Sequence, residues 1–151
     1  MARRDRPLRV AVLLLLAGCS APAPRPETEP IRPEDLAALP APITRENARD
    51  VVRKCLQRHA SDASTTHRRY GYVYRADGFD QVLFEAFTDG RRDRVSRTAI
   101  AYAGVREAAA STRVDPTRLR RVTDVRVDGW TATFDDPDVA LALVRALELL
   151  R

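Results

Sequence analysis

The stretch TDVRVDGWTATF, from Thr123 to Phe134, predicts a two-stranded antiparallel ribbon. Its central Asp128-Gly129 pair suits a type I′ turn, in which both turn residues have positive φ. If Val127 pairs with Trp130, one face of the ribbon carries Thr123, Val125, Val127, Trp130, Ala132 and Phe134. The other face then carries Asp124, Arg126, Thr131 and Thr133. This alternation predicts a half-buried sheet with one apolar face.

The segment that follows the ribbon, DDPDVALALVRALELLR, predicts a C-terminal helix. Asp136 is an N-cap residue, Pro137 suits the first helical position, and Asp138 favours the positive end of the helix dipole. A broad apolar face is formed by Val139, Ala142, Leu143, Ala146, Leu147 and Leu150. We expect this face to pack on the sheet.

Two more Asp-Gly pairs, at 77–78 and 89–90, predict hairpin turns further upstream. They link YGYVYR, QVLFEAFT and RRDRVSRT into a meander in which Glu85 faces Arg94 and Phe84 faces Val95. The next segment, AIAYAGVREAAASTRV, is compatible with a helix by propensity and with a strand by alternation. We favour the strand.

An amphipathic helix is predicted ahead of the sheet, in ITRENARDVVRKCLQRH, with Thr44 as its N-cap. Its apolar stripe consists of Ala48, Val51, Val52, Cys55, Leu56 and His59. Because the stripe lacks Trp and Phe, packing against the sheet is favoured over contact with an anionic membrane. The predicted fold is therefore α+β: an N-terminal helix, one antiparallel sheet of about five to six strands, and a C-terminal helix packed on the sheet.

The order of strands, the element IAYAGV (100–105), the Trp-containing last strand and the closing helix resemble pleckstrin-homology-like domains over about 70–151. The resemblance implies a small β-sandwich or half-barrel that is plugged by its C-terminal helix and binds partners or lipids. The helix before the first strand departs from that family.

The N-terminus has the pattern of a secretory signal, with four arginines in MARRDRPLR followed by an apolar run too short to span a bilayer. Its end, Leu16-Ala17-Gly18-Cys19, resembles the lipobox of bacterial lipoproteins. This resemblance implies cleavage before Cys19 and attachment of diacylglycerol to its thiol. The alternatives are an ordinary signal peptide cleaved near 21–23 and a twin-arginine export signal. Several buried acyl chains hold a protein durably on a membrane.

Three regions follow from these patterns: a signal peptide (1–18), the lipidated Cys19 with a proline-rich tether (19–43), and one α+β domain (44–151). An extended tether has a reach of about 50–70 Å. Within it, RPEDLAALP predicts a helical turn, for which a transient turn in a solvated linker is favoured and docking of Leu36 and Leu39 on the domain or a partner is the alternative. Since Ser20 is not the aspartate that retains related lipoproteins at the inner membrane, the resemblance favours the outer membrane, facing the periplasm. The outer face of the cytoplasmic membrane is the alternative.

Support for catalysis is thin, because neither His59 nor His67 belongs to a recognisable triad or metal motif. Cys55 and His59 lie four residues apart on one helix face, which would be half of a metal or thiol–imidazole site. A small buried thiol beside a core-edge histidine is the favoured interpretation. We therefore predict no enzyme, no cofactor and no metal, with an accessory enzyme that uses Cys55 and His59 as the alternative.

Two candidate binding surfaces remain, a tyrosine stripe (Tyr70, Tyr72 and Tyr74) and an arginine cluster (Arg91, Arg92 and Arg94). Core packing under a helix is favoured for the tyrosines, and solvated loop ends are favoured for the arginines. The leader contributes +3 of the formal net charge of +5, so the mature chain is too weakly basic to indicate nucleic acid. We expect a membrane-anchored, non-catalytic binding domain, in contact with lipid through Cys19 and with an envelope protein as its partner.

Overall fold

The computed structural model describes residues 27–89 and 93–151. Two helices, six strands and two short 3₁₀ turns make up this part of the chain. In order, they are a 3₁₀ turn (Pro33–Leu36), α1 (Ala48–Ala63), β1 (Arg68–Arg75), β2 (Gly78–Glu85), β3 (Arg94–Ala101), a 3₁₀ turn (Tyr102–Gly104), β4 (Ala108–Asp115), β5 (Arg120–Val127), β6 (Trp130–Phe134) and α2 (Pro137–Leu150). The α+β class and the two predicted helices are confirmed, but α1 begins at Ala48 with Asn47 as its N-cap residue, and not Thr44 as predicted.

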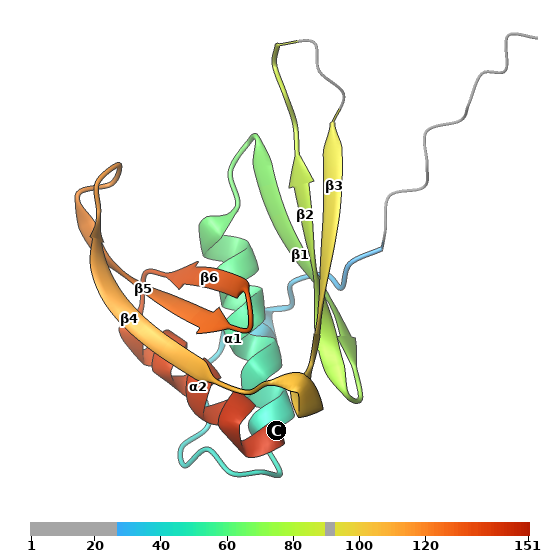
Figure 1. The fold of residues 1–151 in the computed structure, drawn as a ribbon, viewed down its shortest axis with the longest axis vertical. Helices are drawn as coiled ribbons and strands as arrows, with labels where there is room; N and C mark the ends of the chain where they lie inside the picture. Colours follow the sequence, from blue (N-terminus) through green and yellow to red (C-terminus); the bar gives the residue numbers. More distant parts are fainter. Residues whose placement is uncertain (1–26, 90–92) are drawn as a thin grey trace, which may run out of the picture.

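The six strands form two antiparallel sheets, β1-β2-β3 and β4-β5-β6, so the prediction of a single sheet is wrong. The first sheet ends at β3, and the 3₁₀ turn at 102–104 leads the chain to β4 in the second sheet. Figure 1 shows the sheets on opposite sides of α1, with α2 beside α1. This arrangement is not clearly a pleckstrin-homology-like half-barrel.

The register of both predicted ribbons is confirmed. Val127 pairs with Trp130 across β5 and β6, and Glu85 pairs with Arg94 across β2 and β3. Asp128 and Gly129 have φ values of 40° and 88°, as a type I′ turn requires. The segment 99–114, for which strand was favoured, contains the end of β3 and most of β4.

The turn at Asp77-Gly78 differs from the prediction, because neither residue has positive φ. Gly78 is the first residue of β2 and pairs with both Arg75 and Ala101. A Cβ atom at this position would lie 2.0 Å from the carbonyl oxygen of Ile100. Glycine is therefore needed here for the close approach of β3 and not for a left-handed turn. At Asp89-Gly90, the glycine lies outside the described residues.

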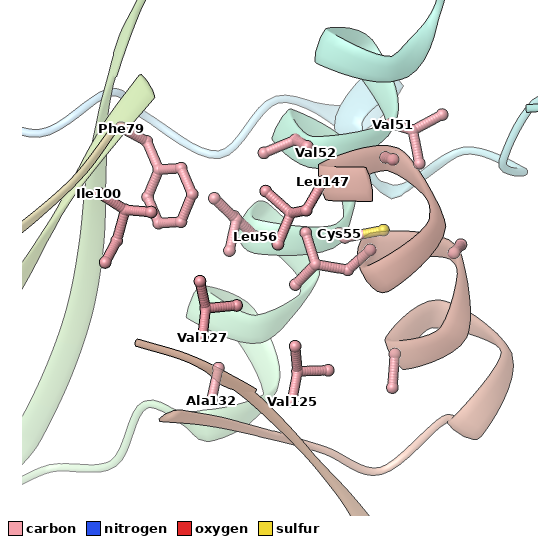
Figure 2. Close-up of a cluster of buried hydrophobic side chains, with 14 of the residues drawn as sticks. Val51, Val52, Cys55, Leu56, Phe79, Ile100, Val125, Val127, Ala132 and Leu147 are labelled. Atoms are coloured by element: carbon pink, nitrogen blue, oxygen red, sulfur yellow. The ribbon is translucent and has the colours of Figure 1, made fainter. Parts of the chain in front are cut away.

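The core lies around α1, which contacts side chains from both sheets and from α2. Figure 2 shows α1 residues Val51, Val52, Cys55 and Leu56 between Phe79 and Ile100 of the first sheet and Val125, Val127 and Ala132 of the second, with Leu147 of α2 beside them. All ten side chains belong to one buried cluster. The remaining face of α1, with Arg49, Asp50, Ser61 and Asp62, is exposed, as in an amphipathic helix.

The residues ahead of α1 lie on the domain, in contrast to the expected solvated linker. The Glu29 amide donates to the carbonyl of Tyr72 on β1, and Thr28 occupies the space beside Gly71. Arg53 of α1 forms an ion pair of 2.7 Å with Glu29 and a hydrogen bond of 3.1 Å with the buried Asp35. The predicted turn at Pro33 is present as the first 3₁₀ turn, and it is docked on α1.

Candidate functional site

Cys55 and His59 lie on the same helix, but their polar atoms have different partners. The Cys55 Sγ donates to the carbonyl of Val139 on α2 at 3.4 Å, and burial raises the pKa of the thiol to about 12. Nδ1 of His59 faces the hydroxyl of Tyr72 on β1 at 2.8 Å. The two side chains are therefore held apart by separate contacts, and the thiol stays protonated and inaccessible. The prediction that Cys55 is buried is confirmed.

A chain of hydrogen bonds sets the tautomer of His59. The side-chain amide of Gln81 donates to the Tyr72 hydroxyl at 3.0 Å. We therefore assign the Tyr72 proton to the bond with Nδ1 of His59, which leaves the second ring nitrogen, Nε2, as a donor. Burial lowers the pKa of His59 to about 4, so the ring is neutral near pH 7.

His59 is also part of the wall of a cavity of about 280 Å³ at the C-terminal end of α1, which we call the α1 cavity. Its lining residues come mainly from α1, from β1 of the first sheet, and from β4 and β6 of the second sheet, so residues distant in sequence meet there. Its charged walls are Arg68, Arg113, Arg118 and Asp115. Hydroxyl groups are contributed by Thr65, Tyr70, Thr131 and Thr133.

The three arginines of the α1 cavity are paired to different extents. Arg68 donates twice to Glu85, at 2.9 and 3.0 Å, and Arg113 donates twice to the buried Asp124, at 2.7 and 3.3 Å. Arg118 approaches Asp115 and Asp135 only to 3.9 and 3.8 Å, beyond hydrogen-bonding distance. A guanidinium group carries five N–H donors, so each arginine keeps donors beyond those that its carboxylate uses.

Asp115 is a weaker acceptor for a ligand than its charge suggests. One of its oxygens accepts hydrogen bonds from the backbone amides of Thr117 and Arg118 at 2.8 and 3.4 Å. These amide contacts, the Thr117 bond first, hold the pKa of the carboxyl below its ordinary value. Its other oxygen faces Arg118. The Thr133 hydroxyl donates to Asp124, so the donors of the cavity come chiefly from its three arginines, which suit an acceptor-only group.

The predicted site residues are dispersed in the structure. Tyr72 is fully buried, whereas Tyr70 and Tyr74 are partly buried against the core, and of the three only Tyr70 borders the α1 cavity. Arg94 is exposed at the start of β3. Cys19, Arg91 and Arg92 lie outside the described residues.

Sequence reasoning missed the contribution of Arg68, Arg113, Thr131 and Thr133 to one cavity. Arg113 and Thr133 lie on strands that both pair with β5, so the predicted ribbon could have placed Thr133 near Asp124. Arg68 belongs to the other sheet, and no local pattern links it to them.

The architecture is thus an α+β domain with two three-stranded sheets around a central helix, and its candidate site is a polar cavity. No protein-family model, curated protein or solved structure matches the chain. Within 27–89 and 93–151, no group of three His, Cys, Asp or Glu side chains is placed to hold a metal ion. The same part of the chain has no helix of the length and apolarity needed to cross a membrane.

Proposed function

We propose that this chain is a cell-envelope lipoprotein, anchored through an acylated Cys19, whose small domain binds a ligand or an envelope protein without catalysing a reaction. The anchor rests on the lipobox-like Leu16-Ala17-Gly18-Cys19 at the end of a signal-like segment. Outer-membrane attachment facing the periplasm is the favoured location, with the outer face of the cytoplasmic membrane as the alternative.

The docking of residues 28–35 on α1 and β1 limits the length of the proposed tether. Thr28 contacts the position of Gly71, so the chain from Cys19 to the first docked residue spans at most about 30 Å. This reach is about half of that expected for a fully extended tether. An anchored domain of this kind lies close to the lipid surface, because its tether is short.

The separate partners of Cys55 and His59 support a binding role over the alternative of an enzyme that uses this pair. A thiol with a raised pKa, bonded to a backbone carbonyl inside the core, is a poor nucleophile and a poor metal ligand. The Tyr72 hydroxyl occupies Nδ1 of the neutral His59 ring. The α1 cavity is the concave surface in the described part of the chain that combines His59 with three arginines.

Intact mass spectrometry of the protein purified from bacterial membranes tests the anchor. We expect a mature chain that begins at Cys19 and carries the added mass of diacylglycerol, with or without a further acyl chain. Cys19→Ser is the matched variant, and it should accumulate without acylation and be released from the membrane fraction. An unmodified Cys19, or a mature chain that begins elsewhere, would overturn the proposal.

A further inference from the structure

We propose that the α1 cavity is a binding site for a small oxyanion, of the phosphate or sulfate type, in which His59 donates from Nε2 and Arg118 supplies the principal charge. This inference goes beyond the lipid anchor and does not depend on it. It assigns a ligand class to a site that is built from both sheets and from α1.

The position of His59 is the first support. Its side chain is 3% exposed, and Nδ1 is occupied by the Tyr72 hydroxyl. Nε2 is directed away from Nδ1 in the imidazole ring, and His59 lines the cavity whereas Tyr72 does not, so we assign Nε2–H as the donor toward the cavity. The structure gives Nε2 no protein partner in the described part of the chain. A neutral N–H group aimed into a cavity binds an anion without the cost of ionising a buried ring.

The second support is the imbalance between donors and acceptors around the cavity. Arg68, Arg113 and Arg118 are donors only, and the Thr65 hydroxyl accepts from the Arg68 amide, which leaves its own proton to donate. Asp115 is the one carboxylate in the wall, and it is engaged by backbone amides and Arg118. An oxyanion accepts at every oxygen, so it satisfies such a wall better than a neutral hydroxylated ligand does.

Size and access restrict the ligand further. The cavity volume of about 280 Å³ is just below the usual range for drug-sized ligands, which fits a phosphate or sulfate group with its immediate attachment. Arg118 is followed by Leu119, which is 83% exposed at the tip of the β4–β5 turn. The same chemistry occurs in a free anion and in a lipid headgroup, and the exposed leucine beside Arg118 would suit contact with a lipid surface.

Nuclear magnetic resonance of the imidazole nitrogens in the full-length protein, held in maltoside detergent, tests the inference. We expect His59 to show the Nε2–H tautomer at pH 7 and its Nε2 signal to move saturably on addition of inorganic phosphate or sulfate. Chloride at equal ionic strength should have no saturable effect. Arg118→Gln should weaken binding at least tenfold. Arg121→Gln, on the same strand pair but outside the cavity, should bind as the unmodified protein does.

Vesicle binding and thermal melts complete the test. Vesicles of phosphatidylcholine with and without phosphatidic acid distinguish a lipid phosphate from a free one, and saturable binding of either source that is lost in Arg118→Gln supports the site. Thermal melts establish that the variants are folded. The inference is overturned if neither source moves the His59 signal saturably, if chloride does so equally, or if Arg121→Gln loses as much affinity as Arg118→Gln. Because no arm reads acylation, failure here is distinct from failure of the lipoprotein proposal.

Discussion

The Tyr72 hydroxyl lies 2.8 Å from Nδ1 of His59, and this contact joins the first sheet to the central helix. Gln81 donates to the same hydroxyl from the neighbouring strand, which directs the Tyr72 proton toward the imidazole. Burial of His59 disfavours its charged form and lowers its pKa to about 4. His59 is therefore neutral in the folded state.

This coupling predicts a loss of stability in mild acid. Between pH 6.5 and about 4 the unfolded chain protonates His59 and the folded chain does not, so the free energy of unfolding falls as the pH falls. The expected loss is about 2–3 kcal/mol between pH 7 and pH 4. Urea unfolding at a series of pH values measures it.

Asp124 has a lowered pKa, because the effect of burial is outweighed by hydrogen bonds from Arg113 and Thr133. Its protonation therefore lowers the free energy of unfolding only as the pH falls below about 4.

His59→Gln should flatten this profile above pH 4, because glutamine does not titrate. His67→Gln is the control, since His67 is an exposed residue just before β1. Its profile should keep the slope of the unmodified protein. Equal slopes in all three proteins would contradict the assignment of the effect to His59.

Gly78 and Gly104 should respond oppositely to alanine. Gly78→Ala places a Cβ atom 2.0 Å from the Ile100 carbonyl oxygen, and we expect a loss of about 1–3 kcal/mol because β2 and β3 must separate. At Gly104 the nearest atom to a new Cβ is 4.0 Å away, so Gly104→Ala should be neutral or slightly stabilising. Chemical denaturation of both variants measures the difference. Similar losses would argue against the close approach at Gly78.

Cys55 should react with bulky thiol reagents only when the protein unfolds. Its side chain is fully buried and its pKa is about 12, so both access and thiolate formation are suppressed in the folded state. The measurement is the labelling rate of the Cys19→Ser variant in increasing urea, in which Cys55 is the remaining thiol. The rate should follow the unfolded fraction. Rapid labelling in the absence of urea would contradict the packing of α1 against α2.

Arg53 should hold the residues ahead of α1 in place. Arg53→Gln removes its contacts with Glu29 and with the nearly inaccessible Asp35. An expected loss of about 1–3 kcal/mol follows, because that carboxylate keeps the Arg32 amide but loses its charged partner. Hydrogen exchange at the Glu29 amide, which is bonded to Tyr72, should accelerate. Lys54→Gln is the control, because its partner Asp50 is exposed, in contrast to Asp35, and the pair should contribute less than about 0.5 kcal/mol. Unchanged exchange in Arg53→Gln would contradict this role.

Local patterns in the sequence were sufficient for the two helices and for the register of the β2–β3 and β5–β6 pairs. The Asp128-Gly129 turn placed Val127 opposite Trp130, and the cap of Asp136 with Pro137 placed the start of α2. These features depend on neighbouring residues and on the period of side-chain orientation. The burial of Asp124 did not follow from alternation, and in the structure this buried carboxylate accepts hydrogen bonds from Arg113 and Thr133 of the two adjacent strands.

By itself, the sequence determined the two helices, the meander of β1, β2 and β3, the β5–β6 hairpin and the lipobox-like motif on which the anchor is proposed. Only the tertiary structure decided that β3 and β4 belong to different sheets, that the proline-rich segment from Thr28 docks on α1, and that Arg68 and Arg113 border one cavity with His59. The physical reason is the separation in sequence between the residues that interact. Turns and amphipathic periods are set by residues within one or two turns of chain, whereas docking and cavity walls depend on packing between segments far apart in sequence.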